Sequence, residues 1–242
     1  MEFRALDASS MSQIKRYTDA FKSAQEPKLD FLIMTQGILS ADGRAETPEG
    51  IDRKMALHYY GRQLLIRELL PVLQNDAKVI VVLDGQRGDP NQLDWEDLDL
   101  KKHYSSRRAA SHCISMNDAM VQYHAAQEQK QGKPRRHFVH AAPGLVNTNI
   151  FMGLPWYLRP IARVAGEIFG VPPSDCAQFL LGGVSECTAA GEKEGRFWSN
   201  IDSKGRLVEN KAIWNEEQMR IVAQHTWNLV DGAIEGTPSS SI

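Results

Sequence analysis

Short apolar runs alternate along the chain with longer segments of helical periodicity. The runs that indicate strands, because they are short and bounded by polar or turn residues, are 3–6, 29–34, 78–84, 136–142 and 196–202. Apolar residues at helical spacing predict helices over 49–73, 104–130, 156–170, 172–190 and 216–233. This order predicts an α/β fold in three layers, a Rossmann-like parallel sheet with crossover helices. We expect one domain over residues 1–242, with a loose tail at 235–242.

The carboxyl ends of the predicted strands are where an open α/β sheet binds its ligands. Loops 35–43, 84–88 and 143–148 follow three of these strands, so they should share one cleft. The acidic stretch 88–100 indicates an insertion after one strand. The amphipathic segment 156–170 is either a flap near this cleft or a helix of the core or of a subunit contact.

Composition narrows the range of functions. The chain has 242 residues, 42% of them hydrophobic, and a formal net charge of -2, so nothing favours a nucleic-acid partner. Its three cysteines, Cys113, Cys176 and Cys187, lack the spacing of a zinc site, and we expect no metal. Their odd number fits a reducing, cytoplasmic location. The longest purely aliphatic run is Val79–Leu83, so we expect neither a leader nor a membrane partner.

Five segments resemble, in the same order, landmarks of the short-chain dehydrogenase/reductase family. They are ALDASS (5–10), LDFLIMTQG (29–37), ETPEGIDRKMALHYYGRQLLIRELLPVL (46–73), SHCISMNDAM (111–120) and HAAPGLVNTNI (140–150). They resemble a strand-end Asp-Leu-Ser motif, a strand with its Asn-Asn-Ala-Gly turn, the long helix after it, the helix of a Tyr-x-x-x-Lys pair, and the nicotinamide loop. The resemblance implies an oxidoreductase that uses NAD(P) on a ketone or alcohol of a small metabolite.

The resemblance also implies which residues would contact the cofactor. Asp7 would meet the adenine, and Gly37 is what remains of the turn after the second predicted strand. Pro143, Gly144 and Thr148 would wrap the nicotinamide end.

The catalytic helix departs from the family pattern. In the family, a tyrosine is the general acid/base, and a lysine four residues later shares its helix face and lowers its pKa. With Ser115 matched to the family's serine in this helix, His112 takes the place of the tyrosine and Met116 that of the lysine. Tyr104 and Arg108 offer a competing Tyr-x-x-x-basic register. Spacing to the HAAPG loop favours the register of His112 and Met116.

Two further catalytic positions are also changed. Leu83 or Asp84 lies where a serine normally ends the strand and polarises the carbonyl. If Gly61 and Leu65 match the glycine and leucine of the long helix, His58 takes the place of the catalytic asparagine.

The family's phosphate-binding loop, Gly-x-x-x-Gly-x-Gly after a first strand, has no counterpart, since the first glycine is Gly37. The alignment therefore leaves out the family's first two strands, which would lie between 3–6 and 29–34. Their absence would expose the edge of a hydrophobic strand. Upstream sequence could supply them, residues 1–28 could repack against the edge, or a partner chain could complete it.

Three functions follow as hypotheses. The first is an oxidoreductase of this family with impaired NAD(P) binding, of the kind found in fungal secondary metabolism. The second is an inactive scaffold subunit that forms a homodimer through helices 49–73 and 104–130. The third is a non-redox cyclase or isomerase in which His58 and His112 act as an acid/base pair, one of them oriented by Asp84.

Overall fold

The computed structural model describes residues 2–24, 28–40, 42–132, 136–148, 156–157 and 159–236. Its sheet holds strands in the order β1-β2-β3-β4, all parallel: β1 (Leu29–Met34), β2 (Leu73–Val82), β3 (His137–Ala141) and β4 (Trp198–Ile201). The helices are α1 (Met11–Ser23), α2 (Arg53–Met55), α3 (Gly61–Leu69), α4 (Ser106–Lys130), α5 (Arg159–Phe169), α6 (Pro173–Glu194) and α7 (Glu216–Glu235). A π-helix (Ala56–Tyr60) joins α2 to α3, and short 3₁₀ turns lie at Leu70–Val72 and Pro90–Gln92.

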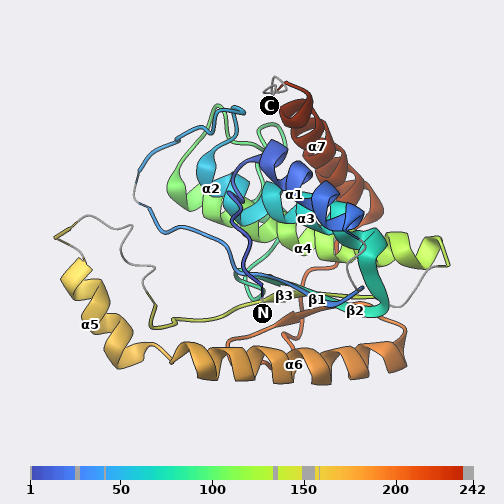
Figure 1. Ribbon diagram of the computed structural model, residues 1–242. Coiled ribbons are helices and arrows are strands. Elements are labelled where there is room, and N and C mark those ends of the chain that lie inside the picture. The colour runs from blue at the N-terminus through green and yellow to red at the C-terminus, as the bar shows by residue number, and fades with distance from the viewer. Residues whose placement is uncertain are drawn as a thin grey trace.

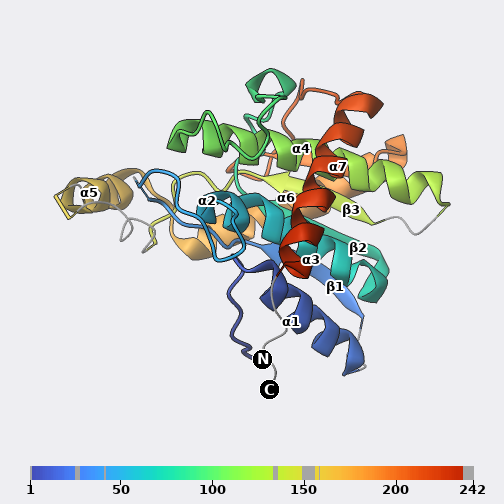
Figure 2. The ribbon, with the colours of Figure 1, turned by 90° about the horizontal axis from the view of Figure 1, so that it is seen from above.

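Helices cover both faces of the sheet, which confirms the predicted three-layer α/β fold (Figure 1). One layer holds α1, α3, α4 and α7, and the other holds α6. Figure 2 shows α7 crossing the layer of α3 and α4, and α1 packs on α3 and α7.

Alternate side chains of β2 build the two sides of the core, as the period of a strand requires. Val79 and Val81 join the large cluster under α1, α3, α4 and α7. Ile80 points to the other face and packs in the cluster of α6 with Leu180 and Val184.

Side-chain caps fix where the helices of the large layer begin. The Ser105 side chain accepts a bond from the Arg108 amide at the start of α4, and Asn215 and Gln218 form a capping box on α7. At α1, the Glu49 carboxylate accepts the amides of Met11 and Ser12, at 2.7 and 3.0 Å. A carboxylate is stabilised there by the unpaired N–H groups and the positive end of the helix.

The predicted strand at 3–6 is wrong, because residues 2–7 form no strand and Phe3 is 85% exposed. In this structure β1 pairs only with β2 among the described residues, so the segment has no strand partner that would keep it extended. The expected open edge of β1 is found, since β1 pairs only with β2 among the described residues. In addition, Phe31 and Ile33 are 51% and 47% exposed on the face that α6 covers elsewhere.

The predicted helix over 49–73 is broken into α2, the π-helix, α3 and a 3₁₀ turn. Pro71 accounts for its end, since a proline in the interior of an α-helix removes a hydrogen bond and clashes with the preceding turn. The strand β2 then begins at Leu73, earlier than the predicted residue 78.

Arg62 ties the carboxyl ends of the neighbouring strands β1 and β2 together. It is 1% exposed, and its guanidinium donates to the carbonyls of Gln36 at 2.5 Å and Val82 at 2.8 Å, and to that of Leu57 at 3.3 Å. Burial lowers its pKa to about 10. The arginine therefore joins the loop that follows β1 to the last residue of β2.

Replacing Arg62 with lysine should lower the free energy of unfolding by about 2 kcal/mol, because a compact ammonium cannot reach the three carbonyls that the wider, planar guanidinium spans. Urea unfolding of the two proteins measures the loss. Arg67→Lys, on the same helix with a side chain 29% exposed, is the matched control and should change stability by less than about 1 kcal/mol. Equal losses for the two variants would contradict the role given to Arg62.

Candidate functional site

The loops that follow β1, β2 and β3 lie at one edge of the sheet, and His58 holds the first of them. Its Nε2 accepts the amide of Ile38 at 3.0 Å, and a Cβ at Gly37 would lie 2.7 Å from the same nitrogen. Burial, together with the nearby Arg62 charge, lowers the pKa of His58 to about 4. His58 is thus a neutral acceptor that fixes the turn at Gly37.

His112 of α4 is bonded to the backbone of the acidic loop, the stretch 88–100. It is 1% exposed, its Nε2 accepts the Asp94 amide at 3.0 Å, and its Nδ1 donates to the Leu98 carbonyl at 3.2 Å. Burial lowers the pKa of His112, so the neutral ring with both nitrogens bonded is the stable form. Met116, one turn later, is fully buried in the large cluster.

Ser115 also binds a loop, since its Oγ accepts the amide of Asp89 at 3.2 Å. His58, His112 and Ser115 therefore each fasten a helix to a different stretch of loop backbone. Within the described part of the chain, no contact joins the rings of His58 and His112.

In the competing register, Tyr104 has a cation beside it, but that cation is not Arg108. Arg108 is 54% exposed and pairs with Asp94 at 3.6 Å. The cation that reaches Tyr104 is Lys54, whose Nζ donates to the Tyr104 hydroxyl at 3.1 Å and lies 5.5 Å from the ring centre. The same Nζ donates to the carbonyls of Asp42 and Gly43. A local Tyr-x-x-x-basic pattern could not reveal Lys54, which lies far away in the sequence.

The residues expected at the cofactor do not gather at one place. Asp7 accepts from the Ser9 hydroxyl and amide, and the hydroxyl bond is the main cause of the lowered pKa of Asp7. It lines a cavity of about 340 Å³ beside Glu49 and the end of α7. Gly37 packs on the His58 ring instead.

The loop after β3 packs against α6 and the turn after β4. The Pro143 carbonyl accepts a weak bond from the Cys176 thiol at 3.6 Å. Gly144 has φ +67°, and a Cβ there would lie 2.8 Å from Cβ of Ser203, so this turn requires glycine. Thr148 is exposed at the end of a described range.

In the register that the sequence favours, the described residues do not match the family's nicotinamide-binding pair. Met116 stands at the position of the lysine that would meet the ribose, and it has no charge and no exposure. His112, in the place of the tyrosine, has no ring nitrogen left to face a substrate.

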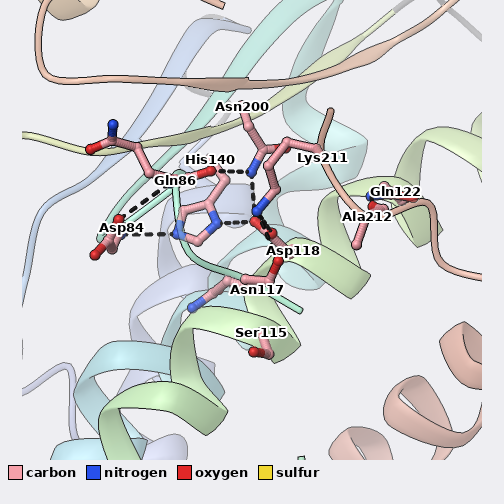
Figure 3. A network of polar contacts seen from close by, with 12 residues as sticks. Asp84, Gln86, Ser115, Asn117, Asp118, Gln122, His140, Asn200, Lys211 and Ala212 are labelled. Atoms are coloured by element: carbon pink, nitrogen blue, oxygen red, sulfur yellow. Dashed lines mark hydrogen bonds and ion pairs between the residues drawn. The ribbon is translucent and has the colours of Figure 1, made fainter. Parts of the chain in front are cut away.

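A buried polar network that the sequence did not indicate lies under the loop after β2 (Figure 3). Asp118 of α4 accepts a bond from His140 Nδ1 of β3, and its Oδ1 also accepts from Asn200 Nδ2 of β4 at 2.6 Å. The Lys211 ammonium lies 2.5 Å from Asp118 Oδ2. Asp118 and His140 are wholly buried, and the Lys211 side chain is 6% exposed.

The network closes onto the backbone of loop 84–88. The amide of Asp84 donates to His140 Nε2 at 3.2 Å, the Gly85 carbonyl accepts from Asn200, and the Gly88 carbonyl accepts from Lys211, both at 2.9 Å. Asp84 thus bonds His140 through its backbone, and its carboxylate faces the Gln86 amide and Arg87. The sequence feature that could have pointed to the network is Asp118, a charged residue beside Met116, Ala119 and Met120 in the helix predicted over 104–130.

Asp94, Asp97 and His103 place three ligand atoms within 4.8 Å of one another in the acidic loop. Protein groups already occupy them. Asp97 accepts the amides of Lys101, Lys102 and His103, and His103 Nδ1 lies 2.9 Å from Asp94. These contacts close the loop, so the three groups already have partners within the protein.

Comparison with known proteins extends the fold to a family. No family model matches the sequence. The chain is 34% identical over 239 residues to the NmrA-like family domain-containing oxidoreductase notO of Aspergillus sp., over 93% of this chain and 70% of that protein. It is 26% identical over 243 residues to the short-chain dehydrogenase/reductase tropG of Talaromyces stipitatus, over 87% and 70%. The chain belongs to the short-chain dehydrogenase/reductase family.

A further relative of this short-chain dehydrogenase/reductase is oxidoreductase AN1596 of Emericella nidulans, 41% identical over 129 residues, which are 52% of this chain and 37% of that protein. Among solved structures, NADPH-bound carbonyl reductase from chicken fatty liver matches with a TM-score of 0.55 and 15% identity, over 86% of this chain and 75% of that one. A Burkholderia multivorans structure described as a short-chain dehydrogenase/reductase with bound NADP matches with a TM-score of 0.52 and 17% identity, over 85% and 75%. These structures share the NAD(P)-binding Rossmann-like fold of the family. Among the residues described, no helix of this short-chain dehydrogenase/reductase combines the length and apolar character needed to cross a bilayer.

Proposed function

We propose that this short-chain dehydrogenase/reductase has kept the family fold without its Tyr-Lys hydride-transfer chemistry, and that it serves as a binding or scaffold subunit in the metabolism of a small molecule. The observation that carries the proposal is the state of His112 and Met116. A general acid/base needs a proton within hydrogen-bond reach of the substrate. Both ring nitrogens of His112 are hydrogen-bonded to the acidic loop, and Met116 lies in the core.

The third hypothesis, an acid/base pair of His58 and His112, finds no support in these contacts. Each ring accepts a backbone amide of its own loop, and Asp84 is bonded to His140. Two neutral rings fixed in this way cannot exchange a proton with a substrate without breaking the loops that they hold.

The contact between Lys54 and Tyr104 favours a second candidate, an oxidoreductase acting on a ketone or alcohol of a small metabolite. Here Tyr104 would be the proton donor, with Lys54 holding its hydroxyl oxygen at 3.1 Å. The names of the relatives, which are oxidoreductases, support this candidate. Against it, Lys54 donates to three acceptors at once, which is the bonding of a structural ammonium.

Thermal-shift titration of the full chain with NADPH and NADH, followed by turnover assays on ketones and alcohols, separates the two candidates. We expect no shift at millimolar cofactor and no turnover. If turnover is found, three variants show which residue it depends on: His112→Gln, Met116→Leu and Tyr104→Phe. Turnover lost only in Tyr104→Phe would establish the second candidate, and turnover lost in His112→Gln with an unchanged melting temperature would contradict the first.

Pairing of the subunit through helices 49–73 and 104–130 stays a prediction. In the structure α1 packs on α3, and α7 packs on α4, so a homodimer through these helices would use the surface that remains outside those contacts. Sedimentation velocity measures the oligomeric state. A cytoplasmic location and a role in fungal secondary metabolism are likewise part of the proposal.

A further inference from the structure

A cavity of about 390 Å³ lies between α4 and the loop after β2, on the other side of α4 from His112 and Met116. Its lining consists of Arg87, Gln92, Arg107, Ala110, Ser111, Ile114 and Ser115. The five residues from α4 recur at helical spacing and so form one face of that helix. The volume is in the range of pockets that hold small metabolites.

The lining carries two positive charges and no acidic side chain. The Arg107 guanidinium has no hydrogen bond or ion pair with any residue that the structure describes. Arg87 is 81% exposed, with an ion pair to Asp84 at 3.2 Å. Arg108, the neighbour of Arg107, instead lies 3.6 Å from Asp94. The cavity therefore presents an uncompensated guanidinium that a ligand could neutralise.

The remaining lining suits a ligand with a polar head and a short apolar body. The hydroxyl of Ser111 and the amide of Gln92 can donate hydrogen bonds, while Ala110 and Ile114 supply apolar contact. The Ser115 hydroxyl already accepts the Asp89 amide, which connects the floor of the cavity to the loop at 88–92. Guanidinium groups bind carboxylates and phosphates through paired hydrogen bonds.

We propose that this cavity is a binding site for a small anionic molecule, a carboxylate or phosphate on a short apolar body, with Arg107 as the main anchor and Arg87 at the rim. The site lies beyond the carboxyl end of β2, where open α/β sheets bind ligands. The proposal does not depend on whether the protein transfers hydride, because binding is measured without turnover.

Calorimetric titration of the full chain with three probes of one shape tests the charge requirement. The probes are benzoate, phenyl phosphate and the neutral amide benzamide. We expect at least one anion to bind at millimolar concentration and benzamide not to bind. The stronger of the two anions identifies the preferred head group. Binding of neither anion, or equal binding of benzamide and benzoate, would overturn the proposal.

Two single substitutions on adjacent residues test the location. Arg107→Ser should weaken binding of the anion about tenfold or more, since it removes a charge-assisted pair of bonds. Arg108→Ser removes the same charge from the same turn of α4 but outside the cavity, and it should leave affinity within about twofold. Both side chains are exposed, so both variants should fold, which a melting curve confirms. Equal weakening by the two variants would show attraction by net charge alone and refute the site.

Discussion

Replacing Asp118 with alanine should lower the free energy of unfolding by about 3–5 kcal/mol, the cost of leaving a buried charge without its partner. The loss has two sources. The Lys211 ammonium, with a side chain 6% exposed, would keep only the Gly88 carbonyl, and His140 Nδ1 would face no acceptor. Urea unfolding followed by circular dichroism measures the change.

A double substitution separates the charge from the packing. In Asp118→Ala with Lys211→Met, no buried ammonium is left unpaired, so part of the stability should return and the two single effects should not add. The matched surface control is Asp231→Ala, which breaks the pair with Arg67 at 2.7 Å where the carboxylate is 48% exposed. That variant should lose less than about 1 kcal/mol. A comparable loss in the two alanine variants would mean that the network adds nothing beyond a surface ion pair.

Acidification from pH 7 to pH 4 should destabilise the protein steeply, because several histidines are buried in the neutral form. Burial lowers the pKa of His58 and His124 to about 4 and that of His137 to about 3. Below the ordinary pKa of 6.5 the unfolded chain binds protons that the folded chain does not, so stability falls as pH falls. Each fully shifted group contributes at most about 1.4 kcal/mol per pH unit.

Urea midpoints measured between pH 7.5 and pH 4 report this loss of stability. The informative variant is His124→Gln, since His124 donates to Gln63 and stacks on Phe138 in the core. Its stability should depend less on pH than that of the parent protein, whatever its absolute value. His103→Gln is the control, because that side chain is 57% exposed. A flat profile between pH 6.5 and pH 4 would contradict the assignment of neutral buried rings.

Sequence periodicity located most of the elements because their signals are local. The helix predicted over 104–130 is α4 at Ser106–Lys130, and the strand at 29–34 is β1 with the same bounds. Both signals come from the spacing of apolar residues within a single element. The predicted strand at 3–6 failed since a strand also needs a neighbour, which its own residues cannot specify.

The candidate site was less accessible to sequence reasoning, because its contacts join distant residues. Lys54 reaches Tyr104, and Asp118 reaches His140 and Lys211, with no pattern of spacing between them. His112 was found by its alignment with a tyrosine, but its two bonds to the acidic loop depend on how that loop folds back over α4.

The π-helix at Ala56–Tyr60 bears on how the sequence should be aligned with its relatives. A π turn holds one residue more than an α turn, so the flanking segments α2 and α3 are out of phase by one position. His58 lies inside this turn, so its match to the family's asparagine, which depends on Gly61, assumes a regular helix between the two residues. If the extra residue of this turn is treated as an insertion, α2 and α3 stay matched to the corresponding helical segments of the relatives. A residue next to His58 then takes the position of the family's asparagine. The length of this single turn, rather than the identity of any side chain, thus decides which residue of the long helix is compared with a catalytic one.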